Sequence, residues 1–512
     1  MERVFLKITL ILTICCIGLI FSIDALGQEP PMPPNHPPVK QGGADNSIDS
    51  EKINTAVKRG VEFLKKQQTQ NGTWVSTKLH EGKYEDGVTA FVLLALLKCG
   101  VDRNDRQIAA GFNFLRSKPF KSVYTAACTI LALEALYAPE EEEETKEEED
   151  KGKKETITVS ADTYEKKIWK NFRKHASPQD KKLLEDALRF ILSCQQTNIW
   201  RYPGGMPGGD MPGQPGDGDF SGLEDFSNTQ YAMLALYSAR RLGCAVPVST
   251  WSKVADYAIK YQEEKGPKVE WFPVPAADFE ISKLKGLEEK LLKEFAQAAK
   301  KYNKELKKAI KEGKSPEEAG LQKPGDDLTT TVIDPYENKE YGAEKKDMYA
   351  RGWAYLPKPT SPVTGSMTTS GVISLVICKV GLEGSAMWNG TLKEKVNAGI
   401  RDGCAWIAHN FTVSSNPNAQ GLWPLYYIYG LERAGVLSLC RTFGTHSWYE
   451  EGVNYLLSIQ LQDGSWSEDS NICGISNTCF ALLFLKKATT PVVKLPGDDS
   501  IFTGEGLLGK KK

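Results

Sequence analysis

The amino-acid sequence predicts an all-α protein, an α/α toroid of about six helical hairpins in two concentric rings, with two charged insertions. An amphipathic segment recurs about six times along the chain, and a nearly uncharged apolar segment follows each copy. An amphipathic helix buries one face, whereas a helix that is apolar on all sides must lie between other elements. Both demands are met if the amphipathic helices form an outer ring around an inner ring of the apolar helices, because repeats bury their apolar faces against their neighbours.

The amphipathic segments share a spacing of residue types. Where it is complete, the pattern has a small residue, an aromatic residue three positions later, an aliphatic residue, then a Gln and finally a Trp. The clearest copies run from Arg59 to Trp74 and from Glu451 to Trp466, and a third runs from Ala187 to Trp200. Weaker copies lie around Gly111, Val254 and Gly403. The residues that we assign to this structural repeat are Phe63, Gln68, Trp74, Phe190, Gln195, Trp200, Trp423, Tyr455, Gln460 and Trp466.

The apolar segments are predicted to be the inner helices. Most of them open with a Thr followed by a run of Ala, Val, Leu and Phe, while the fifth, Leu422 to Ala434, is divergent. Short polar side chains cap helix starts and Gly ends helices, so both should mark the boundaries. Candidate N-caps are Asp86, Ser227, Thr368 and Ser476, and candidate ends are Gly100, Gly243, Gly381 and Gly435.

The spacing of the aromatic residue, the Gln and the Gly-x-Trp resembles the repeat of the squalene cyclase and protein prenyltransferase superfamily. That resemblance covers most of the chain and implies a terpenoid cyclase-like α/α toroid. We expect the Gln and Trp of each copy to tie the end of one outer helix to the start of the next inner one.

The domain boundaries follow from composition. Residues 1–27 are typical of a signal peptide, with Arg3 and Lys7 before the apolar run from Ile8 to Phe21, so we expect a protein that is exported, whether periplasmic, extracytoplasmic or secreted. An uncleaved anchor is the alternative; after cleavage we expect no membrane span. A Pro-rich tether follows at 28–48, then the toroid at 49–490 with insertions at 139–178 and 276–350, then a tail at 491–512.

The overall composition excludes several classes of protein. Lys and Arg total 64 against 65 Asp and Glu, for a net charge of −1, which offers no electrostatic footprint for nucleic acid. The hydrophobic fraction of 41% is too high for a disordered chain.

The catalytic signatures that the resemblance implies are incomplete in this chain. Cyclases of this superfamily use an Asp-x-Asp-Asp acid, and the nearest approach here is Asp217-Gly218-Asp219. Its prenyltransferases hold zinc with an Asp-x-Cys pair and a distant His. Asp402-Gly403-Cys404 matches the pair, but it lies on a predicted outer helix and no His opens an inner one. We therefore expect no metal and no cofactor.

The remaining candidate residues lie on the predicted inner helices and at their rims. The stretch from Trp423 to Arg433 combines three Tyr with an acid and a base, and paired carboxylates could act on a glycan. We expect a protein that binds an apolar or glycan ligand, or a protein partner, through the central cavity or a rim. The alternative is an active lyase, hydrolase or cyclase-like enzyme with an unrecognised cavity site. The candidate ligand-binding residues are Tyr231 and Tyr427, and the candidate catalytic ones are Asp225, Tyr426, Glu432 and His446.

Overall fold

The computed structural model describes residues 50–76, 84–139, 161–195, 198–201, 225–315, 318–321, 336, 345–356, 361–467 and 472–493. The predicted signal peptide, the Pro-rich tether, the loop that holds Asp217 and Asp219, and the tail after residue 493 lie outside these ranges. All described residues fall within one unit, Asp49–Lys512.

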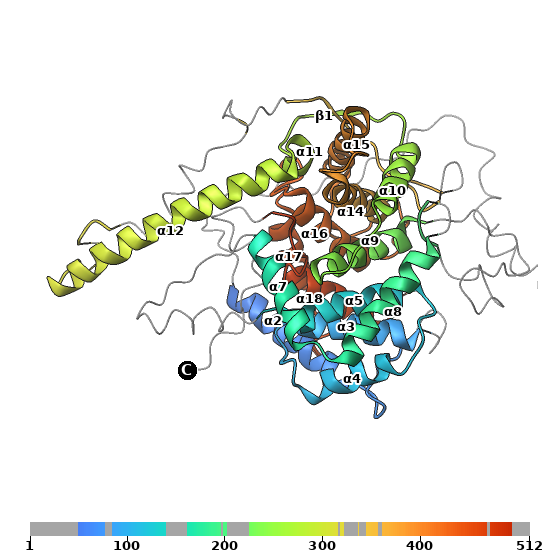
Figure 1. The fold of residues 1–512 in the computed structure, drawn as a ribbon, viewed down its shortest axis with the longest axis horizontal. Coiled ribbons are helices and arrows are strands. Elements are labelled where there is room, and N and C mark those ends of the chain that lie inside the picture. The colour runs from blue at the N-terminus through green and yellow to red at the C-terminus, as the bar shows by residue number, and fades with distance from the viewer. Residues whose placement is uncertain are drawn as a thin grey trace, which may run out of the picture. The chain divides into compact units, whose positions relative to one another are not determined.

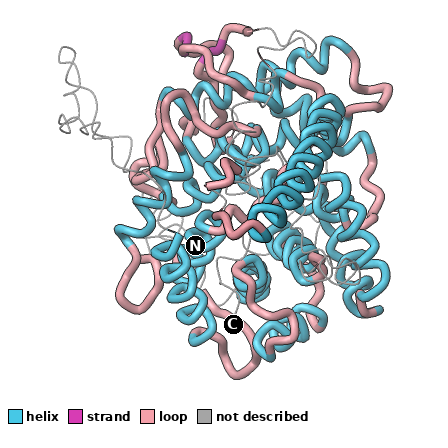
Figure 2. The backbone as a smooth tube through the Cα atoms, turned by 90° about the vertical axis from the view of Figure 1, so that its left-hand side faces the viewer, coloured by secondary structure: helices cyan, strands magenta, loops and turns pink. Residues whose placement is uncertain are grey.

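The described chain is mainly helical, which confirms the all-α class (Figure 2). Its one sheet pairs two short antiparallel strands, β1 (Lys268–Val269) and β2 (Met348–Tyr349). The first insertion contributes α7 (Ala161–His175), and the second contributes α11 (Pro275–Asp278) and α12 (Ile281–Lys311). The backbone N–H groups of Ile281 and Ser282 donate to the Glu383 carboxylate, which fixes the start of α12 against the end of α14.

Six apolar helices contact one another in a closed order (Figure 1). Along the chain α3 packs on α5, α5 on α9, α9 on α14, α14 on α16 and α16 on α18, and α18 packs back on α3. Side chains on all sides of these helices are buried, as their composition predicts. The helices are α3 (Glu85–Lys98), α5 (Val123–Leu136), α9 (Phe226–Arg241), α14 (Gly365–Leu382), α16 (Pro424–Ser438) and α18 (Gly474–Leu485).

Among the described helices, α14 alone is long and apolar enough to cross a membrane by length and composition. Its apolar window is 94% buried inside the protein, which is how a core helix of the same composition behaves.

In the described chain, six amphipathic helices pack against the apolar set. For example, α4 packs on α3, α8 on α5, and both α10 and α15 on α14. The small residue of the repeat permits this close approach: a Cβ added at Gly452 would lie 2.2 Å from Phe484 Cζ, and one at Gly111 would lie 2.9 Å from Leu93 Cδ2. These helices are α2 (Ser50–Lys66), α4 (Arg106–Arg116), α8 (Pro178–Cys194), α10 (Val248–Tyr261), α15 (Gly390–His409) and α17 (Trp448–Ile459).

The repeat Trp joins an amphipathic helix to the apolar helix that follows it. The Trp74 indole N–H donates to Leu64 O at 2.7 Å, and its backbone N–H donates to Thr89 Oγ1 at 3.1 Å. The side chain therefore closes the end of α2, while the main chain joins the first turn of α3. The same pair of bonds recurs at Trp200, Trp353 and Trp466.

The repeat Gln differs from what we expect from the sequence, because it reaches the next amphipathic helix instead of the next apolar one. Gln68 Nε2 donates to Gly72 O in its own loop and to Gln107 O of α4. The reason is positional: the half-buried amide extends sideways from the end of its helix, and the Trp and Thr already connect that end to the inner helix. The arrangement recurs in three more copies, in which the Gln Nε2 donates to a backbone oxygen of another helix: Gln195 to Thr250 O, Gln262 to Gly399 O and Gln460 to Ala56 O.

The aromatic position of the repeat lies half-buried on the outer helices. The Phe190 ring lies 6.2 Å from that of Phe120, and Tyr455 donates its hydroxyl to Ser414 O. Phe63 is half-buried on α2. Trp423 does not match the other repeat Trp residues, because it is 38% exposed and precedes α16 in a left-handed backbone conformation.

Several expected helix boundaries are wrong. Asp225 and Thr364 cap α9 and α14 in place of Ser227 and Thr368, because the capping oxygen must stand before the first helical residue. α3 and α18 begin after Tyr84 and Cys473, without a side-chain cap. Gly100 and Gly243 do follow helix ends, with positive φ. Gly381 and Gly435 instead lie inside helices, where the rings of Trp251 and Trp448 pack against them.

Candidate functional site

A chain of hydroxyl groups links three of the apolar helices. Tyr124 OH of α5 lies 2.5 Å from Ser227 Oγ of α9, and Ser227 Oγ lies 2.6 Å from Tyr426 OH of α16. Gln230 Nε2 donates to the same Tyr426 hydroxyl. Each of these residues lies in the first turns of its helix, so three helix starts converge on this cluster. Tyr426 is thus held by hydrogen bonds across the interior.

Asp225 stands beside this cluster as the N-cap of α9. Its carboxylate accepts from the backbone N–H of Asn228 at 2.7 Å and from Asn228 Nδ2 at 2.9 Å. Burial raises the pKa of Asp225 to about 7, and the hydrogen bonds from Asn228 and Ser227 oppose that shift only in part. A carboxyl group in this state can hold a proton near neutral pH, although its capping bonds already give it a structural role.

Tyr231 lies further along α9 and faces the buried guanidinium of Arg433. The Tyr124 and Tyr231 ring centroids are 4.8 Å apart. The Arg433 guanidinium lies over the Tyr231 ring at 4.9 Å and over the Tyr429 ring at 4.0 Å. Tyr231 is therefore an interior residue that contacts a cation.

The other sequence-predicted candidates lie elsewhere. Both Glu432 oxygens accept from Thr489, one from its backbone N–H at 3.1 Å and one from its hydroxyl at 2.7 Å, and burial raises the pKa of Glu432 to about 7. His446 stacks on Phe411 at 4.2 Å, its Nδ1 lies 3.2 Å from Glu451 Oε1, and its side chain is 42% exposed. Asp225 and Tyr426 come together, but Glu432 and His446 do not join them.

Tyr427 packs between helices. A Cβ added at Gly365 of α14 would lie 2.7 Å from the Tyr427 ring, and the ring is almost fully buried. Its hydroxyl has no hydrogen-bond partner among the described residues.

The Asp402–Cys404 pair is also part of the packing. Asp402 forms an ion pair with Arg351 at 2.6 Å and accepts from the Tyr349 backbone N–H, so it fastens α15 to β2. Burial raises the pKa of the Cys404 thiol well above its ordinary value. Within the described residues, no group of three or more His, Cys, Asp or Glu side chains comes together in a way that could hold a metal ion.

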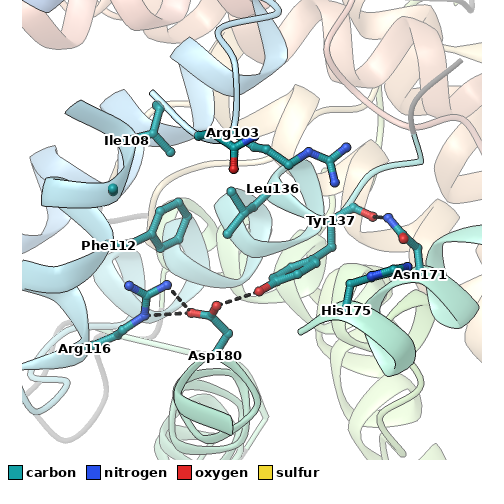
Figure 3. A pocket seen from close by; sticks show the side chains of 11 residues that line it. Arg103, Ile108, Phe112, Arg116, Leu136, Tyr137, Asn171, His175 and Asp180 are labelled. Carbon is teal, nitrogen blue, oxygen red and sulfur yellow. Dashed lines mark hydrogen bonds and ion pairs between the residues drawn. The ribbon is translucent and has the colours of Figure 1, made fainter. Parts of the chain in front are cut away.

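A pocket of about 410 Å³ opens between α4, α5, α7 and α8 (Figure 3). Its apolar wall is formed by Ile108 and Phe112 of α4 and Leu136 of α5. Figure 3 shows polar side chains around this wall, with Asn171 and His175 of α7 on one side and the pair of Arg116 from α4 and Asp180 from α8 on the other. Arg103, Asn104, Ala109 and Tyr137 complete the lining.

The polar groups of this pocket are held in place by a hydrogen-bond network. Asp180 accepts from Arg116 Nε at 2.8 Å and from Tyr137 OH at 2.6 Å. Burial, and then the hydrogen bond to Asp180, raise the pKa of Tyr137 to about 12, so its hydroxyl remains a donor. Asn171 Nδ2 donates to Tyr137 O, and Arg103 Nη2 donates to Ala138 O.

Among the described residues, the charges that line the pocket are net positive. Arg103 and Arg116 contribute two positive charges and Asp180 one negative charge, while His175 lies exposed at the end of α7. A volume between about 300 and 1,000 Å³ with an apolar wall and a few oriented polar groups is typical of a small-molecule site. The arrangement can accept an anionic group beside an apolar body.

Sequence reasoning missed this pocket. One of its walls is α7, which belongs to an insertion between repeats and carries no repeat signal. One local signal was available: Ser177 and Asp180 have the spacing of a capping box, and Ser177 Oγ accepts from the Asp180 backbone N–H. That signal marks the start of α8 but does not indicate a ligand.

Comparisons with known proteins add little to this geometry. No family model matches the chain, and no curated protein matches it. A crystal structure of a protein from Actinoplanes is similar at 13% identity, over 86% of this chain and 100% of that chain, with a TM-score of 0.37. A likeness at that level carries no argument about fold or function.

Proposed function

We propose that this chain is an α/α toroid of the squalene cyclase and prenyltransferase repeat type, with the six apolar helices as the inner ring and the six amphipathic helices as the outer ring. The closed order of inner contacts supports this arrangement. So does the bond from Gln460 Nε2 to Ala56 O, which joins the last outer helix to the first.

The function that we propose is the binding of a small organic anion in the pocket between α4, α5, α7 and α8, on a helical scaffold. The observation that carries this proposal is the combination of about 410 Å³ of space, an apolar wall and a net positive lining. The ligand class is a carboxylate or phosphate attached to a compact apolar group. Arg103 would face the anion, while Ile108 and Phe112 would contact the apolar part.

The centre of the inner helices supports ligand binding less well. Tyr231, Tyr426, Tyr427 and Tyr429 are all buried, and their rings pack on residues of neighbouring helices. A ligand between them would have to displace these contacts, whereas the pocket beside α7 offers space already present.

Binding of benzoate, with uncharged benzamide as the isosteric comparison, tests the proposal. We expect benzoate to raise the melting temperature of the full chain and to bind in calorimetry, and benzamide to do neither, because only the carboxylate interacts with the positive lining. Phenyl phosphate tests the other anionic head group.

Arg103→Gln is the critical variant, with Arg106→Gln as its control. Arg103 lines the pocket, while Arg106 is exposed on α4 and does not. We expect Arg103→Gln to weaken benzoate binding about tenfold or more, and Arg106→Gln to leave it unchanged. If neither anion binds the wild-type protein, or if both variants bind as the wild type does, the pocket is not an anion site.

The alternative, an enzyme with a site near Asp225 and Tyr426, is favoured by the raised pKa of Asp225. It requires an accessible substrate position, and the Asp225 carboxylate is almost fully buried under the bonds that cap α9. We therefore rank it second.

Export is a separate proposal that rests on residues 1–27. N-terminal sequencing of the protein expressed with its leader in a secreting host tests it, with a mature chain that begins at Gln28 as the expected result.

A further inference from the structure

Arg433 is a cation buried at the centre of the inner helices. It is 1% exposed, and its Nε donates to Tyr429 O one turn earlier in α16. Its two terminal nitrogens, Nη1 and Nη2, are buried and have no hydrogen-bond partner in the part of the chain that the structure describes. Two charged donor groups thus lie in the interior without an acceptor.

The acidic groups nearby are engaged elsewhere. The Glu432 oxygens accept from Thr489, and the Asp225 oxygens accept from Asn228. The Glu134 carboxylate forms its ion pair with Arg241, with Nη2 at 2.6 Å from Oε2. None of these three carboxylates forms a hydrogen bond with Arg433, so its terminal nitrogens have no carboxylate acceptor among the described residues.

Arg241 shows how the same fold treats a buried guanidinium that has a partner. It is buried almost as deeply as Arg433, and it binds both oxygens of Glu134, through Nε at 2.7 Å and Nη2 at 2.6 Å. An unpaired buried charge costs several kcal/mol, which is why buried ions in proteins are paired. Arg433 departs from this rule unless a group from solution accepts hydrogen bonds from its terminal nitrogens.

The neighbouring side chains of Arg433 orient its guanidinium plane and limit the size of any acceptor that can bind to it. The faces of Tyr231 and Tyr429 cover the guanidinium, an arrangement that stabilises the cation and leaves its hydrogen-bonding edge as the place for an acceptor. The Tyr429 ring lies 6.5 Å from Phe91 and 6.1 Å from Phe480. Side chains from α3, α9, α16 and α18 therefore surround the guanidinium, and a small acceptor disturbs these contacts least.

We propose that Nη1 and Nη2 of Arg433 bind a small inorganic anion of the size of chloride inside the inner helices. The anion completes the hydrogen bonding of the guanidinium and neutralises its charge. It is independent of the pocket beside α7, and it makes the stability of the inner helices depend on the anion in solution.

Thermal unfolding of the full chain at constant pH and ionic strength tests this site, with chloride replacing gluconate. We expect the melting temperature to rise by about 1–2 °C for each tenfold increase in chloride above the dissociation constant, from mass action and the unfolding entropy of a domain of this size. Arg433→Met should abolish the chloride response. Arg189→Gln, which removes an exposed Arg of α8, should retain it.

Crystals soaked in bromide give a second test that does not need a folded variant. We expect an anomalous peak within hydrogen-bond distance of Nη1 or Nη2 of Arg433 in the wild-type protein. A chloride response that Arg433→Met retains, or a bromide-soaked crystal without that peak, would show that water satisfies these nitrogens and would overturn the proposal.

Discussion

The bond between the last and the first outer helix should make Gln460→Ala strongly destabilising for a half-buried residue. Gln460 Nε2 donates to Ala56 O and to Gly464 O at 2.9 Å each, and its Oε1 accepts from Arg59 Nη1 at 3.2 Å. Each such bond contributes about 0.5–1.5 kcal/mol, so losing the three costs about 2–3 kcal/mol of the free energy of unfolding. Arg59 keeps its bonds to Leu461 O and Gln462 O, so the helices should not separate fully.

Gln68→Ala is the matched control, because Gln68 donates to Gly72 O and Gln107 O with the same geometry. The bond from Gln68 to Gln107 joins residues 39 positions apart in the sequence, whereas the bond from Gln460 to Ala56 joins residues 404 positions apart. Both variants should lose stability in urea unfolding. Only Gln460→Ala weakens the attachment of α2 to α17, so native-state hydrogen exchange of the α2 amides should rise about tenfold or more over the control.

The reasoning that the Gln460 side chain holds α2 to α17 is refuted if the free energy of unfolding of Gln460→Ala lies within about 0.5 kcal/mol of the wild-type value. It is also refuted if the α2 amides exchange equally fast in Gln460→Ala and Gln68→Ala. Either result would mean that the contacts of α2 with α3 and α18 hold it without help from α17.

Three further predictions concern stability. Burial holds the Asp225 pKa at about 7, above the ~3.9 of an unfolded Asp, so the native state binds more protons than the unfolded state. The free energy of unfolding should therefore fall as pH rises between about 4 and 7. In urea titrations, Asp225→Asn should flatten that slope by up to about 1.4 kcal/mol per pH unit. Gly452→Ala should cost about 1–3 kcal/mol through overpacking, whereas Gly390→Ala, with open space around it, should be near neutral. Trp466→Ala should lower the unfolding free energy by about 3–5 kcal/mol and the half-exposed Trp423→Ala by under about 1, and equal costs would mean that Trp423 packs like the other repeat Trp residues.

The candidate site was partly predictable from local sequence. Asp225 and Tyr426 both lie at the starts of apolar helices, which the sequence indicated. Their helices α9 and α16 are separated by α14 in the order of contacts, so only the tertiary structure shows that Ser227 of α9 bonds to Tyr426. Glu432 and Arg433 looked like one polar cluster because they are adjacent. Adjacent helical residues point about 100° apart, so Glu432 reaches Thr489 while Arg433 reaches Tyr231.

The pocket was not predictable, because its lining comes from four helices. Its charged pair joins Arg116 to Asp180, 64 residues apart, across the first insertion. No periodicity links α7 to the repeat helices, so only packing could bring His175 and Asn171 beside Phe112.

The sequence by itself determined which segments are helices and which faces they bury, because periodicity and composition act over a few turns. It also indicated that the repeat Trp residues are structural. The tertiary structure alone decided the partner of each Gln, the packing role of Gly381 and Gly435, the position of the pocket, and the burial of Arg433 without an acceptor. These features depend on distances between residues tens to hundreds of positions apart, which are set by how helices pack and not by the spacing within any one of them.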